Sequence, residues 1–185
     1  MKSKILQTLH QDHANLIQLL SLIESETGKL EKMSCEASFE ILSLALEYCT
    51  DFPSYCHHPK EDLIYAKLSR REPEIAKQIA DLEEDHKTLN SLTRAVTDEI
   101  AAAISGDGTE KLRETVNRFV RHYRYHIGIE ETEVFPCARR ALTDADWQAI
   151  EDAYADSRDS LFGEHTRDAY IALQQCIVDR AASPH

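Results

Sequence analysis

Glycine and proline are scarce in this sequence, with five of each among 185 residues. Together they make up about 5% of the chain, against roughly 12% in average usage, so folds built from many short strands and tight turns are disfavoured. No run of 18 apolar residues occurs, and no membrane-spanning helix is therefore expected. The N-terminal stretch MKSKILQTLHQDH has neither a continuous apolar segment nor a small-residue cleavage site, so no secretory signal is expected.

Positive charge is the second shortage. Lysines and arginines number 21 against 33 aspartates and glutamates, which gives a formal net charge of −12 with the histidines neutral. A surface of this sign does not release counterions from phosphates, so nucleic-acid binding is disfavoured. Anionic lipid surfaces are disfavoured for the same reason, so no membrane partner is expected. Acidic chains rich in histidine are suited to holding cations, and nine histidines are present.

Paired cysteine motifs are also missing. The cysteines are odd in number and form no Cys-x-x-Cys pair, which fits neither a disulfide framework nor a common zinc site. We therefore expect a protein of the reducing cytoplasm. The five residues are Cys35, Cys49, Cys56, Cys137 and Cys176.

Apolar residues recur every three or four positions along the whole chain, which is typical of amphipathic helices. The pattern predicts an all-α fold, in which residues 1–142 form an up-and-down four-helix bundle. Residues 143–185 are expected to add short C-terminal helices packed on the same domain. Capping and breaking residues place the helix ends: a stop at Gly28, an N-cap at Ser34, a second helix over 35–69, a third beginning near Pro73, a loop over 105–108, an N-cap at Thr109, and C-terminal helices over 143–157 and 164–179.

Two prolines interrupt the second long helix. Because Pro53 and Pro59 each remove a hydrogen bond to the carbonyl four residues back, a kink or restart is expected across residues 51–59. The inner face of the fourth helix is expected to run from Leu112 through Val134 to Cys137.

Each of the four apolar seams is interrupted by histidine or glutamate. With a rise of about 1.5 Å per residue, the midpoint of His57 and Glu61 lies roughly 16 Å before its helix ends, and His86 lies roughly 18 Å after the next helix starts. His86 and the midpoint of His126 and Glu130 are likewise level, because each lies about 27 Å from the junction between the third and fourth helices. The junction between the first and second helices agrees less well, with about 21 Å against 33 Å, so the second helix is expected either to overhang there or to begin later than residue 35. The interrupting residues are His13, His57, Glu61, His86, His126 and Glu130.

Six polar groups at one depth in an apolar bundle require a shared partner, because an unpaired buried imidazole or carboxylate is costly. A cation is the simplest partner, and each His-xxx-Glu pair can reach one centre because its members lie on one helix face. Four imidazoles and two carboxylates without a thiolate suit iron or manganese better than zinc. Two octahedral ions accept roughly 12 bonds. If both glutamates bridge the ions, the four imidazoles and the four carboxylate oxygens supply about eight of these bonds, which leaves about four coordination positions open.

The motifs are similar to those of hemerythrin-like (HHE cation-binding) proteins. The similar stretches are LHQDH at 9–13, HPKED at 58–62, EDH at 84–86 and HYRYHIGIEETEVFP at 122–136; residues 143–163 resemble the C-terminal extension of bacterial members. The resemblance implies an up-and-down bundle around an oxo- or hydroxo-bridged di-iron centre that meets O2 or related oxidants, with manganese or zinc as alternative ions. Its implied ligands are the same six residues. Oxygen-carrying hemerythrins have a second histidine on the third helix, whereas Leu82 and Asn90 flank His86 here.

Several residues near the predicted ligands have simpler interpretations. His122 could supply the missing imidazole, although the seam runs through Tyr123, whose default role is in the core. His10 is expected on the surface, with a role behind the ligands as the alternative. His58 is expected to face outward, and Cys56 is expected to be a buried thiol. Glu131 and Glu133 are expected in solvent, unless one of them orients a ligand imidazole. His165 and His185 are expected to lie away from the site.

The leading functional hypothesis is a cytoplasmic di-iron protein that binds O2, peroxide or nitric oxide as a sensor, scavenger or iron-delivering repair factor. A di-iron oxidase or peroxidase uses the same residues and remains an alternative. Ferritin-like iron handling is another, because Glu83 and His86 have the Glu-x-x-His spacing, although only one such motif occurs. A histidine-phosphotransfer bundle would need a single exposed histidine. Here each of the four helices places a histidine on its inner face, so this function is disfavoured.

Overall fold

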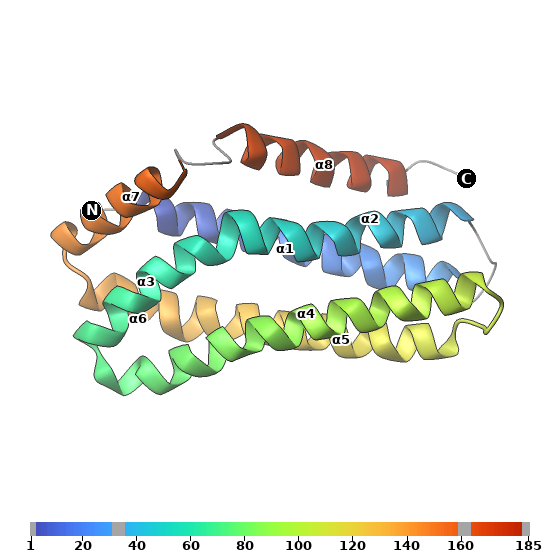
Figure 1. Ribbon diagram of the computed structural model, residues 1–185, viewed down its shortest axis with the longest axis horizontal. Helices are drawn as coiled ribbons and strands as arrows, with labels where there is room; N and C mark the ends of the chain where they lie inside the picture. Colours follow the sequence, from blue (N-terminus) through green and yellow to red (C-terminus); the bar gives the residue numbers. More distant parts are fainter. Residues whose placement is uncertain (1–2, 31–35, 159–163, 183–185) are drawn as a thin grey trace.

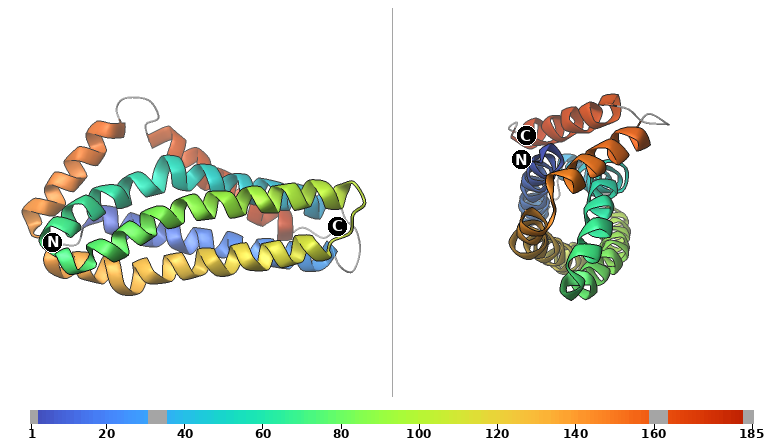
Figure 2. Two further views of the ribbon diagram at one scale, coloured as in Figure 1. Left: turned by 60° about the horizontal axis from the view of Figure 1, so that its bottom comes forward. Right: turned by 90° about the vertical axis from the view of Figure 1, so that its left-hand side faces the viewer.

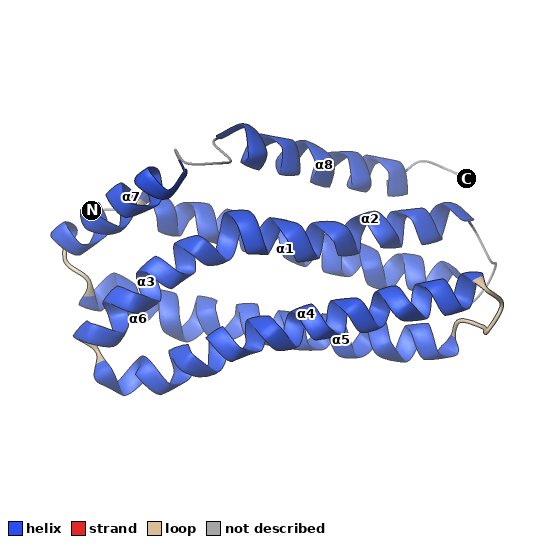
Figure 3. Cartoon of the chain, in the orientation of Figure 1, coloured by secondary structure: helices blue, strands red, loops and turns tan. Residues whose placement is uncertain are grey.

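The chain folds into helices in a computed structural model that describes residues 3–30, 36–158 and 164–182, and these ranges contain no strand (Figure 3). The predicted all-α class is thus confirmed. Four long rods run alongside one another, and two further helices follow at the C-terminal end (Figure 1). The described α-helices are α1 (Lys4–Leu30), α2 (Glu36–Phe52), α3 (His58–Arg71), α4 (Ala76–Ile104), α5 (Glu110–Ile129), α6 (Phe135–Ala141), α7 (Asp144–Arg158) and α8 (Glu164–Ala182). The first rod is α1, the second contains α2 and α3, the third is α4, and the fourth contains α5 and α6.

The junctions between the rods follow the helix-breaking residues. A 3₁₀ turn, η2 (Pro73–Ile75), leads into α4, as the proline there predicted. The turn after α4 contains Gly106 and Gly108 with φ of 104° and 83°, a left-handed conformation that glycine adopts without steric cost. The stop predicted at Gly28 is wrong, because α1 continues through Gly28 to Leu30, the last described residue of this stretch. The N-cap expected at Ser34 lies outside the described residues.

Two of the rods contain a π-helical turn. The second rod is α2, η1 (Pro53–His57) and α3, where the His58 N–H donates to the Pro53 carbonyl. This turn lies within the stretch where the two prolines predicted a kink or restart. The fourth rod is α5, η3 (Glu130–Val134) and α6, where the Phe135 N–H donates to the Glu130 carbonyl. A bond of this type encloses one residue more than an α-helical turn, so the helix face shifts beyond it.

The second π turn corrects the predicted inner face of the fourth rod. Val134 is buried as expected, but Cys137 is only half-buried, and Phe135 and Ala138 point into the core instead. Pro136 explains the difference, because it cannot donate to the carbonyl of Thr132 and so favours a rearranged turn before it.

The apolar core is divided into two clusters along the bundle axis. One cluster includes Leu16 and Leu89, and the other includes Leu9 and Leu82. On α1, His13 lies between Leu9 and Leu16, and on α4, His86 lies between Leu82 and Leu89. The polar interruptions therefore occupy a single level between two apolar clusters, as the spacing along the sequence predicted.

The C-terminal helices pack on one side of the bundle, with α7 against α3 and α8 against α2 and α1 (Figure 2). Helix α7 starts where residues 143–146 predicted, and Thr143 Oγ1 accepts a hydrogen bond from the Asp146 N–H at 3.2 Å. None of the described helices is both long and apolar enough to cross a membrane.

Candidate metal centre

The predicted ligands come together from all four rods. The structure places His13, His57, Glu61 and Glu130 so that one donor atom of each lies within 4.8 Å of the others, and all four side chains are buried. A second group of the same kind contains His86, His126 and Glu130. All six residues predicted from the seams therefore lie in one connected donor cluster, and their ligation of a metal remains a prediction.

Four donor atoms crowd together in the first group. The Nε2 atoms of His13 and His57 are 3.0 Å apart. Glu61 Oε1 lies 2.9 Å from His57 Nε2, and Glu130 Oε2 lies 3.2 Å from His13 Nε2. The donors come from α1, from the start of α3 and its preceding π turn, and from the first residue of the second π turn.

The two glutamates belong to both halves of the cluster. While Glu61 Oε1 faces His57, its Oε2 lies 3.7 Å from His86 Nε2. While Glu130 Oε2 faces His13, its Oε1 lies 3.4 Å from His126 Nε2. Each carboxylate thus directs one oxygen to each half of the cluster.

His58 does not face outward, and this expectation was wrong. Its ring stacks on that of His86 with centroids 3.7 Å apart, and a nitrogen of His58 lies within 4.8 Å of donor atoms of Glu61 and His86. The expectation assumed an unbroken α-helix, in which His57 and His58 are about 100° apart. The wider π turn that ends at His57 lets two successive histidines face the interior.

Several atoms of the cluster have no hydrogen-bond partner within the protein although they are buried. Among the described residues these include Glu61 Oε2 and His86 Nε2. Glu61 Oε1 and Glu130 Oε2 also lack a hydrogen bond, although imidazole nitrogens lie 2.9 Å and 3.2 Å from them. Buried polar atoms are nearly always paired, because an unpaired one costs about 1–3 kcal/mol. Their convergence on one space fits a bound cation.

Carboxylates behind two of the imidazoles fix how the rings present their nitrogens. Glu131 Oε1 lies 2.7 Å from His13 Nδ1, and Asp12 Oδ2 lies 3.4 Å from His57 Nδ1. A neutral ring that donates through Nδ1 has its lone pair on Nε2. The two facing Nε2 atoms, 3.0 Å apart, then direct lone pairs toward one another, and a proton or a cation between them is needed to offset the repulsion.

The charges of the cluster favour added positive charge. Burial opposes the protonation of His13, but Glu130, Glu131 and Glu61 outweigh burial and raise the pKa of this imidazole well above its usual value. Burial likewise opposes ionisation of Glu61, yet His57 and His13 lower its pKa well below the usual range. In contrast, burial lowers the pKa of His58 to about 3, so this ring stays neutral, the form in which imidazole binds metals.

Residues around the predicted ligands depart from several expectations. Glu131 orients an imidazole rather than lying in solvent, and it also contacts His10 Nδ1 at 2.7 Å, so His10 acts from behind the ligands. His122 lies 3.4 Å from Asp85 Oδ1 and belongs to none of the donor groups found among the described residues. Glu133 is exposed and accepts from Gln78, and Tyr123 is a buried core residue, as expected. The side chains of His165 and His185 lie outside the described residues.

Sequence reasoning missed three residues that surround the centre, Tyr65, Asp12 and Asp85. Tyr65 is fully buried, and its hydroxyl donates to Glu130 Oε1. Asp12 is also fully buried, and a signal for it was present: an aspartate precedes histidine at 12–13 and again at 85–86. In both places the aspartate faces a histidine of a neighbouring rod, His57 for Asp12 and His126, at 3.7 Å, for Asp85.

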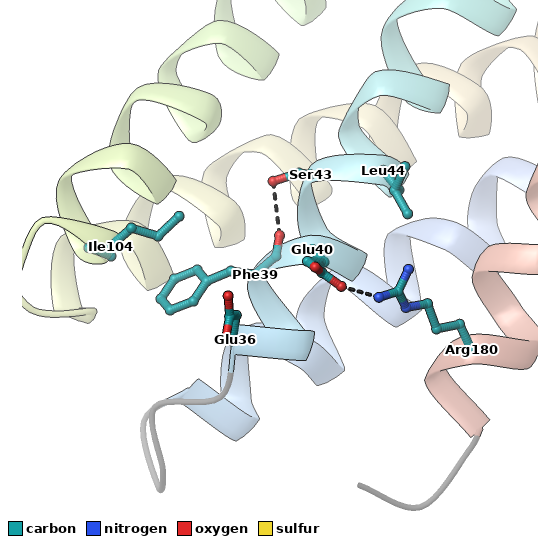
Figure 4. Close-up of a pocket in the computed structure, with 8 residues that line it drawn as sticks. Glu36, Phe39, Glu40, Ser43, Leu44, Ile104 and Arg180 are labelled. Atoms are coloured by element: carbon teal, nitrogen blue, oxygen red, sulfur yellow. Dashed lines mark hydrogen bonds and ion pairs between the residues drawn. The ribbon is translucent and has the colours of Figure 1, made fainter.

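A large pocket of about 780 Å³ lies at the far end of the bundle and includes none of the predicted ligands. Phe39 and Ile104 contribute apolar surface to it, and an ion pair between Glu40 and Arg180 lies at its edge (Figure 4). Nothing in this lining matches the chemistry of the donor cluster.

Comparisons with known proteins agree with the donor cluster. A family model described as the hemerythrin HHE cation binding domain matches residues 4–155, a span that contains every donor named above. No curated protein and no solved structure matches the chain. The match ends within α7 and does not include α8.

Proposed function

The chain belongs to the hemerythrin HHE cation-binding domain family, and we propose that it is a non-haem di-iron protein that binds O2, peroxide or nitric oxide. The observation that carries the proposal is that Glu61 and Glu130 each direct one carboxylate oxygen to each half of the cluster. A single cation in the half of His13 and His57 would leave Glu61 Oε2 without a partner, whereas Glu130 Oε1 would still accept from the Tyr65 hydroxyl. Cations in both halves would engage both oxygens of Glu61.

The donor count leaves room for a small ligand. Four atoms serve the half that contains His13 and His57, and five serve the other half if His58 joins His86, His126 and the two carboxylates. Octahedral ions want about six donors each, so about three positions remain for a bridging oxygen and an external ligand. His58 takes the place of the imidazole that the third helix lacks.

The two halves differ in their access to solvent. The side chains of His13, His57 and His126 are 2–3% exposed, whereas that of His86 is 12% exposed. A small oxidant would therefore reach the centre beside His86. The half that contains His13 and His57 would hold its ion away from water.

The protein's own groups orient the donors and hold protons around the centre. Glu131 and Asp12 fix the rings of His13 and His57, and the Tyr65 hydroxyl holds a proton beside Glu130. Bound iron would supply the redox chemistry that lets the site react with oxygen species, and manganese or zinc would fill the same donors. We place the protein in the reducing cytoplasm, because Cys49, Cys137 and Cys176 have free thiols.

The same residues would serve a di-iron oxidase or peroxidase, and only turnover distinguishes that activity from a sensor, scavenger or iron-delivering repair factor. Ferritin-like iron handling is less favoured. Glu83, which completes its motif, is exposed and belongs to none of the donor groups among the described residues.

Anaerobic titration of the metal-free protein with Fe(II), followed by metal analysis, tests the proposal. We expect two irons per chain and an oxo-bridged absorption band in the near ultraviolet after exposure to O2 or peroxide. His126→Ala should lose one iron, whereas Glu61→Ala should weaken both sites because Glu61 faces both halves. His122→Ala is the matched control, since His122 lies one turn away outside the donor groups. A wild-type protein that stays folded and binds no iron would refute the proposal.

A further inference from the structure

Helix α8 lies beyond the residues that the family model matches, yet one of its side chains reaches the surroundings of the donor cluster. Arg167 Nη2 donates to Asp12 Oδ1 at 2.5 Å, and Arg167 Nη1 donates to Asp12 Oδ2 at 3.1 Å. A two-pronged contact of this kind fixes both the position and the plane of a carboxylate. The C-terminal helix therefore determines how Asp12 is held.

Asp12 transmits this contact to a predicted ligand. Its side chain is fully buried, and its Oδ2 lies 3.4 Å from His57 Nδ1 and 2.7 Å from Lys60 Nζ. Lys60 is itself 1% exposed. Three hydrogen-bonding groups thus converge on one carboxylate oxygen, and only one of them comes from outside the family domain.

We propose that Arg167 is a positioning residue of the metal centre, which acts through Asp12 to set the orientation and donor strength of the His57 imidazole. This inference rests on the proposed metal-binding function. The carboxylate that supports His13, Glu131, is held by His10 instead, so the two imidazoles of the first donor group have different supports. Helix α8 is then part of the metal centre and not only a cover of the bundle.

A small pocket beside Arg167 makes the idea testable by chemical rescue. The pocket has a volume of about 300 Å³, and its lining includes Lys60, Tyr154 and Arg167. If Arg167 is shortened to alanine, the pocket offers a route and space for an added guanidinium ion to take the place of the lost head group against Asp12.

The experiment compares iron binding by Arg167→Ala with that by Arg180→Ala. Arg180 is the matched control, because it lies on the same helix and pairs with Glu40 at the opposite end. Loss of an outer hydrogen-bonding partner of a ligand typically weakens metal binding 10- to 100-fold. Because Arg167 contacts Asp12 and not the ligand itself, we expect Arg167→Ala to lie at the lower end of this range, with iron bound at most about tenfold more weakly and the near-ultraviolet band shifted. Arg180→Ala should show neither change.

Added guanidinium at millimolar concentration should restore affinity and spectrum in Arg167→Ala, whereas urea, which is similar in shape but uncharged, should not. If Arg167→Ala fails to fold, Arg167→Lys retains the positive charge without the paired contact and should show a smaller shift of the same band. Wild-type iron binding with an unchanged affinity and spectrum in the Arg167 variants would overturn this inference alone. Absence of iron in the wild-type protein would instead overturn the proposed function.

Discussion

The pairing of Asp12 with Lys60 should dominate the stability of the metal-free protein. Asp12→Asn keeps the shape of the side chain but removes the charge that lies 2.7 Å from a lysine that is 1% exposed. Breaking a buried ion pair by removing one partner costs about 3–5 kcal/mol. For a chain of this size about 1 kcal/mol shifts the melting temperature by roughly 2–4 °C, so we expect a fall of about 6–20 °C.

Glu24→Gln provides the comparison, because Glu24 also forms an ion pair at 2.7 Å, with Arg124, but both side chains are about 40% exposed. Exposed pairs contribute about 0–1 kcal/mol. The two variants therefore differ mainly in burial. Urea unfolding followed by circular dichroism at neutral pH measures both free energies of unfolding.

A double-mutant cycle identifies the source of the loss. In Asp12→Asn, Arg167 can still contact solvent because its side chain is 21% exposed, whereas Lys60 is only 1% exposed. Adding Lys60→Met should therefore recover much of the stability. The reasoning is refuted if Asp12→Asn costs less than about 1 kcal/mol, or if the two substitutions are additive.

The loss should also depend on pH. Burial already lowers the pKa of Lys60, and Asp12 partly offsets this effect, so the pKa falls further in Asp12→Asn. A lysine whose folded pKa lies below its unfolded pKa destabilises the protein at low pH, and this penalty is lost as the pH rises toward about 10. Asp12→Asn should accordingly regain stability relative to the wild type on the alkaline side.

Three further predictions concern the centre and the C-terminal helices. Tyr65→Phe removes the hydroxyl that donates to Glu130 and should weaken iron binding about tenfold in the Fe(II) titration; unchanged affinity would contradict a role for this contact. Thr143→Ala removes the N-cap of α7 and should lower the free energy of unfolding by about 1 kcal/mol in urea. Thr143 and Arg71 lower the pKa of Asp146 to about 2, so its contribution to stability should be present above about pH 4 and lost toward pH 2. Acid unfolding of Asp146→Asn should lack that step.

The sequence predicted the polar level because helical geometry is regular over most of the chain. The seam of α1 passes from Leu9 through His13 to Leu16, and these three residues are buried in the order that the spacing requires. The same arithmetic placed His86 level with the two His-xxx-Glu pairs. Such patterns need only the periodicity of an ideal helix.

Prediction failed where the helix is not ideal. Pro53 and Pro59 signalled the first break, but Pro136 carried the same signal for the second π turn and was not used. The orientation of His58 depends on how many residues the first π turn encloses, which periodicity cannot supply. Asp12 and Asp85 were missed because each faces a histidine of another rod, and such contacts depend on the relative rotation of the rods.

The two π turns make the spacing of residues along the chain part of the design of the centre. Deleting one residue from 53–56 would remove the extra residue of the first π turn and leave the helical hydrogen bonds on either side of it in place. The rotation of about 100° that accompanies a one-residue change would nevertheless carry Glu61 away from the donors on the other rods. Length variation in these short stretches should therefore be far less tolerated during evolution than substitution at the same positions.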